Sequence, residues 1–178
     1  MEIATSPTRE KYPLSPKKIT KKTIINSLVI IIILAIIWIV VAIPLLAIGN
    51  GSAFTSFTLV ILVVGGVSTL LIYLYQRWYY AVYYYDLNSD YIVIKKGPIT
   101  PREITIPYER VQDVYVDQDL FDRIFTLYDV HLSSATISSG MEAHIDGVEK
   151  MAADGLKKLL LETVSTKLNR NIQLPPPQ

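Results

Sequence analysis

The stretch "WYYAVYYYDL", residues 78–87, contains six aromatic side chains and separates two very different parts of the chain. Before it, the 54 residues between Lys22 and Arg77 include no Asp, Glu, Lys or Arg. After it, short runs alternate between apolar and polar residues. Trp and Tyr favour the boundary between hydrocarbon and water, and Tyr also favours strands. The stretch therefore predicts the end of a membrane helix followed, from about Tyr80, by the first strand of a folded domain.

The uncharged region is long enough for two membrane crossings, since about 20 apolar residues span a bilayer core. "IGNGSA", residues 48–53, supplies the Gly and Asn residues that a tight reversal needs. We predict a transmembrane helix hairpin over residues 23–77, with helices at about 24–48 and 53–75. A cleaved signal peptide is a poorer interpretation, because its apolar region runs only about 7–15 residues.

Charge predicts the orientation of this hairpin. Residues 1–22 carry six Lys and Arg, whereas the predicted turn carries no charge. Lys and Arg are retained on the cytoplasmic side, so we expect a multi-pass protein of a prokaryotic plasma membrane with both termini and the domain inside. Residues 1–22 are also rich in Pro, Ser and Thr and predict a disordered arm. Residues 171–178 predict a flexible tail.

Small residues in the second helix predict a packing face at Gly65, Gly66 and Thr69, because they allow another helix backbone to approach closely. The partner is either the first helix or a helix of another chain. The helices lack ionisable residues at membrane depth, which argues against a proton relay or a transport site.

Residues 78–170 predict a compact, mostly-β domain, which gives an α+β membrane protein as the fold class. Apolar and polar residues alternate in "REITIPY", "VQDVYVD", "LYDVHLS" and "MEAHIDG", as expected for strands with one buried face. The period then changes to helical spacing at Leu156, Leu160, Val164 and Leu168. We predict a final amphipathic helix from about residue 148 to 168 that covers the sheet.

The order of four short runs carries a resemblance: "YDLNSDYIVIKKG", "ITIPYERVQDVYVDQDLFDRIF", "YDVHLSSA" and "AHIDGV". Together with the preceding helix pair, they resemble prokaryotic membrane proteins with a pleckstrin-homology (PH)-like domain, the YdbS/YdbT type. The resemblance implies a small β-barrel or sandwich capped by a helix and tethered at the membrane. It implies no catalytic residues. Thr126 stands where members of the family usually carry Gly, which puts the geometry of that link in question.

A search for chemical sites gives mostly negative expectations. Asp117, Asp119 and Asp122 superficially match a calcium loop, but its Gly and its final Glu are missing, so a solvated acidic link is the better interpretation. His131 and His144 are predicted on the polar faces of two candidate hairpin strands, together with Asp129, Glu142 and Asp146. Surface pairing is favoured over a metal site. We expect no enzyme activity, no cofactor, no metal and no small-molecule substrate.

The balance of charge limits the partners. From Asp86 onward, 10 Lys and Arg stand against 14 Asp and Glu, a net charge of −4 that argues against nucleic acid. Basic and aromatic residues near the membrane exit form a hypothetical site for lipid headgroups, comprising Arg77, Trp78, Lys95, Lys96 and Arg102. A solvated turn explains Lys95 and Lys96 without any ligand and is the favoured interpretation.

Two functions follow from these features. The first is a membrane-anchored, non-catalytic interaction or scaffold module that acts through protein partners or self-association as a homo-oligomer at the inner membrane face. The alternative is a sensor of lipid headgroups or envelope stress that binds anionic phospholipid of the lipid bilayer.

Overall fold

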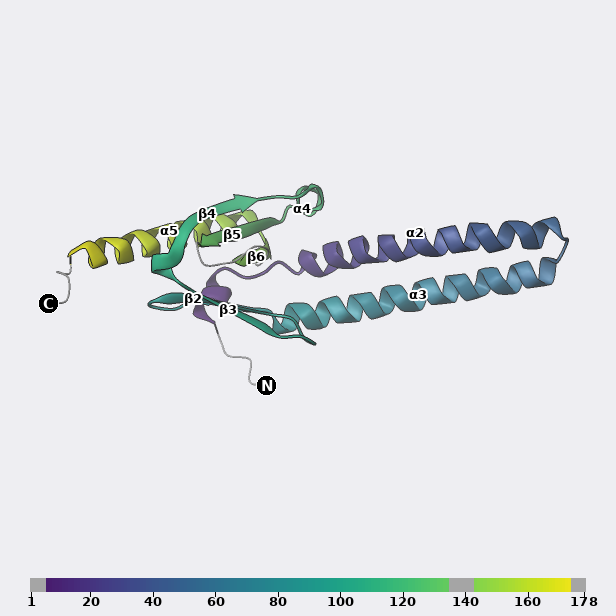
Figure 1. Ribbon diagram of the computed structural model, residues 1–178, viewed down its shortest axis with the longest axis horizontal. Coiled ribbons are helices and arrows are strands. Elements are labelled where there is room, and N and C mark those ends of the chain that lie inside the picture. Colours follow the sequence, from purple (N-terminus) through teal and green to yellow (C-terminus); the bar gives the residue numbers. More distant parts are fainter. Residues whose placement is uncertain (1–5, 135–142, 174–178) are drawn as a thin grey trace. The chain divides into compact units, whose positions relative to one another are not determined.

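The computed structural model describes residues 6–134 and 143–173 and divides into two compact units (Figure 1). We call residues 19–78 the helix pair, and residues 1–18 together with 79–178 the domain. The first turn of one long helix and the last turn of the other belong to the domain. The two units are described separately.

The helix pair confirms the predicted hairpin of two long apolar helices. Helix α2 spans Lys17–Ala47 and α3 spans Gly51–Val82, and both are long and apolar enough to cross a membrane. Gly49 in the turn has φ +72°, a conformation that glycine adopts at little cost. Trp38 Nε1 donates a hydrogen bond of 3.0 Å to Thr58 Oγ1 and so links the two helices. Of the two glycines in the predicted packing face, Gly65 lies close to α2 and Gly66 does not.

The junction between helix and strand lies further along the chain than predicted. Helix α3 continues to Val82, and β1 begins only at Tyr84. Tyr79 and Tyr80, expected at the end of the helix and the start of the strand, are both helical and pack against the domain core. Extending an existing helix fixes one residue for each new hydrogen bond, so a few β-favouring residues do not end it.

Six strands form two three-stranded antiparallel sheets, with orders β1-β2-β3 and β4-β5-β6. The first sheet comprises β1 (Tyr84–Leu87), β2 (Tyr91–Lys96) and β3 (Arg102–Pro107). The second comprises β4 (Val111–Asp117), β5 (Tyr128–Ser134) and β6 (Ala143–Val148). A short 3₁₀ turn, Tyr108–Arg110, links the sheets. The predicted strands are confirmed, but the described residues form two separate sheets rather than a closed barrel.

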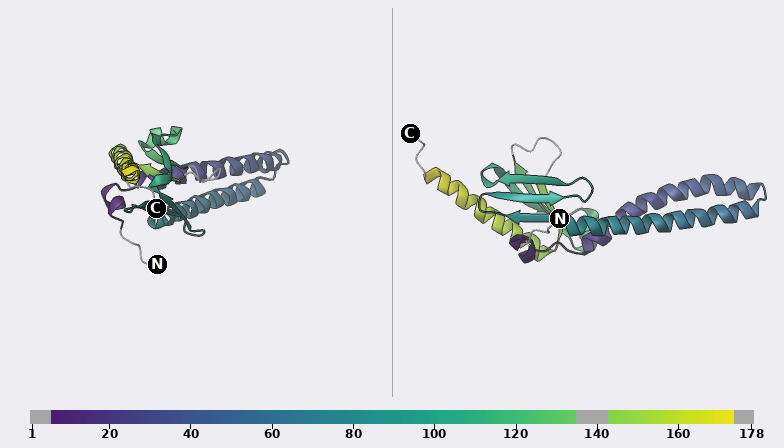
Figure 2. Two further views of the ribbon diagram at one scale, coloured as in Figure 1. Left: turned by 60° about the vertical axis from the view of Figure 1, so that its left-hand side comes forward. Right: turned by 90° about the horizontal axis from the view of Figure 1, so that it is seen from below.

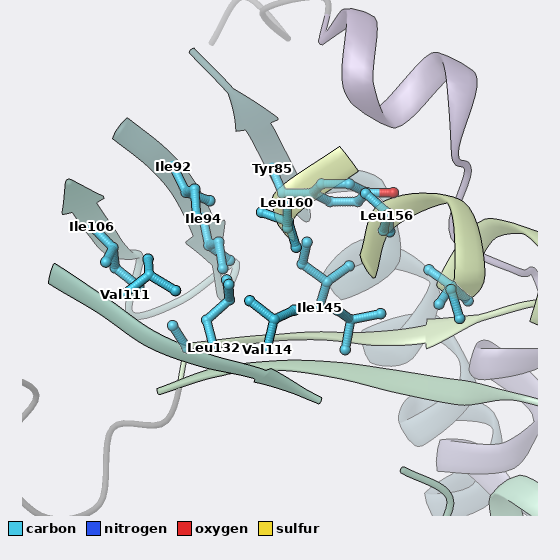
Figure 3. Close-up of a cluster of buried hydrophobic side chains, with 14 of the residues drawn as sticks. Tyr85, Ile92, Ile94, Ile106, Val111, Val114, Leu132, Ile145, Leu156 and Leu160 are labelled. Atoms are coloured by element: carbon cyan, nitrogen blue, oxygen red, sulfur yellow. The ribbon is translucent and has the colours of Figure 1, made fainter. Parts of the chain in front are cut away.

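Helices complete the domain (Figure 2). Helix α4, Leu120–Phe125, connects β4 to β5, and α5, Lys150–Gln173, packs on β4 and β5. Leu156 and Leu160 of α5 are fully buried beside residues of both sheets (Figure 3). The predicted helical stripe is therefore confirmed for these residues, and Val164 packs against the same core. The side chain of Leu168 and residues 174–178 lie outside the described part.

The N-terminal arm is not disordered in its described part, contrary to the prediction. Helix α1 spans Pro7–Lys11, with Ser6 as N-cap and Pro7 at the first helical position, both of which favour helix initiation. Leu14 is buried and forms a β-bridge with Val148. The Tyr12 ring lies where a side chain on Gly155 of α5 would clash with it. Buried contacts thus order a segment whose composition alone indicated disorder.

Candidate functional site

A buried polar cluster lies where β6 ends. Asp146 is 9% exposed. The Lys18 ammonium lies 2.9 Å from Asp146 Oδ2 and donates a 3.0 Å hydrogen bond to the Asp146 carbonyl oxygen. Lys96 Nζ lies 3.7 Å from the other carboxylate oxygen, Oδ1. We call Lys18, Tyr83, Lys96 and Asp146 the junction cluster, because they come from α2, the residue between α3 and β1, β2 and β6.

The local backbone explains why Asp146 is buried, although strand alternation predicted it on the polar face. The pairing of β5 with β6 shifts register between Tyr128 and Val130. Such an irregularity breaks the alternation of side chains between the two faces. Asp129 Oδ1 accepts a 2.7 Å hydrogen bond from the Gly147 amide within this region. The prediction of a solvent-facing Asp146 was therefore wrong.

Gly147 makes room for Lys18. Its φ of +79° favours glycine, and a Cβ built on it would lie 2.7 Å from Lys18 Cδ. Any larger residue would collide with the lysine stem. The Asp146–Gly147 pair thus supplies both the partner of the Lys18 ammonium and the space for its methylenes.

Tyr83 forms one wall of the junction cluster. Its side chain is fully buried, and the Lys18 ammonium lies 3.9 Å from the ring centroid, a cation–π contact. Lys96 Nζ lies 5.4 Å from the same centroid. The hydroxyl donates to the His144 carbonyl oxygen at 3.0 Å. Burial, followed by the nearby Asp146 carboxylate, raises the pKa of Tyr83 well above its ordinary value, so the phenol stays neutral.

The electrostatics of the cluster keep Asp146 ionised. Burial alone would raise the pKa of Asp146, but the ammonium groups of Lys18 and Lys96 outweigh it and hold that pKa well below its usual range. Burial lowers the pKa of Lys96 to about 8, despite the opposing attraction of Asp146. Two buried lysines therefore share one carboxylate. This arrangement suits structural cohesion, since neither lysine nor the carboxylate is left without an opposite charge.

The two histidines lie side by side, as predicted. His131 stands opposite His144 in the β5–β6 pairing, with ring centroids 5.3 Å apart. Tyr115 of β4 stacks on the other face of His131 at 4.9 Å, and His131 Nε2 lies 3.1 Å from Asp117 Oδ1. Among residues 6–134 and 143–173, no group of three or more His, Cys, Asp or Glu has metal-binding geometry. Glu142, a further predicted neighbour, lies outside the described residues.

The acidic link is folded rather than solvated. Asp119 and Asp122 form the capping box of α4, with Asp122 N donating to Asp119 Oδ1 at 2.6 Å, and Asp122 is buried. Carboxylates at a helix start complement its exposed amides and its dipole. The sequence motif at 117–122 therefore begins a helix. Its prediction as a solvated link was wrong for Asp122, which is buried, whereas Asp117 and Asp119 are exposed as predicted.

Comparison with known proteins agrees with this architecture. A family model described as a bacterial PH domain matches residues 23–164, which include most of the helix pair, all six described strands, α4 and much of α5. The chain belongs to the bacterial PH domain family. No curated protein and no solved structure matches the chain. The expected resemblance to a PH-like domain is thus confirmed at the level of the family.

In this bacterial PH domain protein, three of the predicted headgroup residues belong to the domain and two to the helix pair. Arg102 is exposed, and Lys95 is half-exposed and lies 3.2 Å from Glu103. Lys96 instead points into the junction cluster and is largely buried. Arg77 and Trp78 are exposed residues of the helix pair. Of the predicted residues in the domain, Lys95 and Arg102 therefore remain exposed to a charged ligand, and both lie at the same end of the β2–β3 pair.

The predicted packing residues face different surroundings. A Cβ on Gly65 would lie 3.5 Å from Leu34 Cδ1 of α2, whereas nothing lies within 4 Å of one on Gly66. Thr69 Oγ1 donates to the Gly65 carbonyl oxygen at 2.9 Å. Gly65 thus packs within the hairpin of this PH protein, and Gly66 does not.

Sequence reasoning missed the junction cluster. Lys18 was assigned to a disordered arm because it lies among prolines and other lysines, and Tyr83 was taken as an ordinary strand residue. The available signal was Gly147 inside an otherwise regular strand pattern, which indicates a bulge or a close approach of another segment.

Proposed function

We propose that this protein is a membrane-anchored, non-catalytic PH-like interaction module. Its two helices hold the domain at the inner face of the plasma membrane, where the domain binds protein partners or further copies of the chain. The observation that carries the proposal is the burial of Lys18. This residue belongs to the first turn of α2, yet its side chain is inside the domain, paired with Asp146.

The junction cluster makes the helices part of the domain fold. Lys18 enters from α2, and Tyr79 and Tyr83 enter from the end of α3 and pack in or against the core. Breaking a buried ion pair by removing one partner is strongly destabilising, because a charge is left uncompensated. The domain therefore cannot separate from the first turn of α2 without losing stability. A module held so closely to its anchor suits recognition at the membrane surface.

Two sheet edges supply candidate surfaces for a protein partner. β3 and β4 are outer strands of their sheets, and within the described residues no strand pairs with their outer edges. Thr105 of β3 and Gln112 of β4 are exposed there. By contrast, the N-terminal segment covers β1, where Thr8 Oγ1 accepts from Leu87 N at 3.1 Å. An open edge offers main-chain hydrogen bonds to a partner strand.

Photocrosslinking in living cells tests this proposal. A benzophenone amino acid replaces Thr105 or Gln112 in the full chain, with exposed Asp154 on α5 as the matched control position. We expect discrete protein adducts at positions 105 or 112 that are weak or missing at 154. Adducts with a second copy support self-association, and adducts with another protein support scaffolding. The absence of protein adducts at both edge positions would overturn the proposal.

A second function, recognition of anionic lipid headgroups, is favoured by the exposed charge of Lys95 and Arg102. Basic residues close to a membrane surface contribute about 1 kcal/mol each before screening. A Lys95→Gln, Arg102→Gln variant of the full chain in anionic vesicles tests it. The photocrosslinking yield to a lipid-borne probe should fall in the variant and at high salt. An unchanged yield would exclude this candidate.

A further inference from the structure

Large apolar side chains project into solvent from two separate places on the domain. Leu120 and Ile124 of α4 are 77% and 72% exposed, and their spacing of four residues places them on one face of the helix. Ile99, in the turn between β2 and β3, is 68% exposed. Met151 and Leu161 of α5 are also exposed, at 88% and 45%, but Leu120, Ile124 and Ile99 differ from them in their place in the domain, which is described next.

Helix α4 lies at the end of the domain where α2 begins. Thr126, directly after α4, accepts a 3.3 Å hydrogen bond from Lys17 Nζ, and Lys17 is the first residue of α2. Tyr128 at the start of β5 stands opposite Val148, which bridges to Leu14 just before α2. In Figure 1, α4 accordingly lies beyond the end of β4 and away from the C-terminal end of α5.

The turn that carries Ile99 lies at the same end. Lys95 stands opposite Tyr84, two residues after α3 ends at Val82. The β2–β3 turn therefore extends back past the point where the chain leaves α3. Lys96, at the base of this turn, reaches Asp146 in the junction cluster. Both apolar projections thus share one end of the domain with the roots of both helices.

The lengths of the helix roots place a bilayer within reach of this end. From Lys18 to Ile24, where the apolar run of α2 begins, six residues rise by about 9 Å. From Tyr75 to Val82 in α3, seven residues rise by about 10 Å. The headgroup layer on each side of the hydrocarbon is about 5–7 Å thick. Only a few ångströms of helix therefore separate the domain from the headgroups.

We propose that Leu120 and Ile124 of α4, with Ile99 of the β2–β3 turn, insert into the interface of the bilayer that holds the helix pair. The inference rests on the proposed function, because it requires the helices to span a membrane. It names lipid as a direct partner of the domain itself, through apolar contact. Lys17 and exposed Arg123 flank the apolar side chains and suit an anionic surface.

The bilayer is a better occupant than a second protein for two reasons. In the proposed function the helix roots bring a bilayer to this end, and a protein partner would have to displace it. The exposed residues also lie on two elements and form short projections rather than one broad face, which suits shallow insertion more than a protein interface.

The native chain contains no cysteine, so single cysteines with a polarity-sensitive fluorophore can report on this contact. The full chain is reconstituted in phosphatidylcholine vesicles that contain some phosphatidylglycerol and a spin-labelled phosphatidylcholine as quencher. Three positions are compared: Ile124→Cys on α4, Ser165→Cys on the distant part of α5 as the water-exposed control, and Val40→Cys within α2 as the membrane control.

We expect the label at position 124 to emit at shorter wavelength than the label at 165 and to be quenched by the spin-labelled lipid at least threefold more. The quenching should persist at high salt, because apolar contact is not screened. Equal behaviour of positions 124 and 165, with quenching at position 40, would overturn this inference alone. A label at 124 that is shielded from water but not quenched by lipid indicates a protein occupant and also overturns it. Absence of quenching at position 40 would overturn the proposed function as well.

A double variant adds an independent readout. Leu120→Glu with Ile124→Glu replaces exposed residues, so the fold should persist. A label at Ile99→Cys in this background should lose at least half of its lipid quenching, because α4 and the turn contact the same surface. Unchanged quenching at 99 would show that the two projections do not act together, which contradicts the proposal.

Discussion

The helix pair and the domain differ in how far their apolar side chains are exposed. In α2 and α3, Ile, Leu and Val side chains are commonly half-exposed or more, as Val40 is at 65%. In the domain, Ile92, Ile94 and Leu156 are fully buried. The same residue types are therefore exposed in the helix pair and buried in the domain. Water drives the burial of apolar side chains in the domain, whereas the proposed membrane position of the helix pair would leave such side chains in hydrocarbon, where exposure costs little.

The junction cluster follows neither pattern, because it buries charged side chains. A lysine at the start of a membrane helix ordinarily faces water, but Lys18 is 4% exposed and lies among Tyr83, Lys96 and Asp146. The cluster is thus a buried polar site made of residues, such as Lys18 and Asp146, that the sequence predicts to be exposed. The difference teaches that a residue at the start of a long apolar helix can belong to the interior of the domain, and the variants below test whether that interior behaves like the rest of the domain core.

The largest effect is expected for Asp146→Ala. The change leaves two buried ammonium groups without their carboxylate, and breaking a buried pair in this way costs about 3–5 kcal/mol. The free energy of unfolding of the domain can be measured by urea titration in detergent micelles, with near-ultraviolet circular dichroism of tyrosine as the signal. The matched control is Glu149→Ala, which removes an exposed partner of Lys17 at 3.4 Å and should cost less than about 1 kcal/mol. Similar losses in the two variants would mean that the cluster is energetically a surface feature.

Much of the fold was predictable, because helices and strands with a buried or apolar face leave regular patterns of apolar residues in the sequence. The uncharged region predicted α2 and α3, and alternation predicted the strands around Val130 and Ile145. The cluster was not predictable in the same way. Asp146 turns inward because of a register shift, and Lys18 is buried because of a segment more than 120 residues away. Neither the register shift nor the long-range contact produces a periodic pattern in the nearby sequence. Only Gly147 indicates a position where a distant segment of the chain approaches.

The second comparison contrasts truncations to alanine in the two regions. Leu156→Ala truncates a fully buried side chain of the domain core and should cost about 2–5 kcal/mol. Val40→Ala truncates a side chain of α2 that is 65% exposed; in the proposed membrane position of α2, lipid replaces the lost contacts, so the cost should stay well below about 1 kcal/mol. The same urea titration serves for the first variant, and resistance of the helix pair to dissociation in detergent serves for the second. A large loss for Val40→Ala would show that this face packs on protein.

A pH dependence should distinguish Lys96 from solvent-facing lysines. Burial lowers its pKa to about 8 in the folded protein, so between about pH 8 and 10 the unfolded chain holds the proton more tightly than the folded one. The contribution of Lys96 to stability therefore rises with pH through this window, by roughly 1 kcal/mol at pH 9.

The measurement is the difference in unfolding free energy between the native chain and Lys96→Met at about pH 7 and pH 9. The difference should shift in favour of the native chain at the higher pH. Lys95→Met, one residue away and half-exposed, is the control and should show little change. If both variants respond alike, Lys96 is as hydrated as its neighbour and the cluster is open to water.

The smallest effect concerns backbone conformation rather than burial. Thr126, at the end of α4, has φ 55° and is the only residue other than glycine with positive φ among residues 6–134 and 143–173. This conformation costs a residue with a Cβ about 1–2 kcal/mol. Glycine avoids that cost, but its unfolded chain has more conformational freedom to lose on folding, which offsets part of the gain. Thr126→Gly should therefore raise the unfolding free energy by about 0.5–1 kcal/mol. Thr126→Ala removes the same hydroxyl, including its hydrogen bond with Lys17, but keeps the strain, so it should not stabilise the domain.

Because α4 is also the helix proposed to contact lipid, the gain in unfolding free energy from Thr126→Gly should be equal in micelles and in vesicles if it arises from the backbone. A gain confined to vesicles, or an equal gain in the alanine variant, would assign it to the membrane contact or to the lost hydroxyl instead.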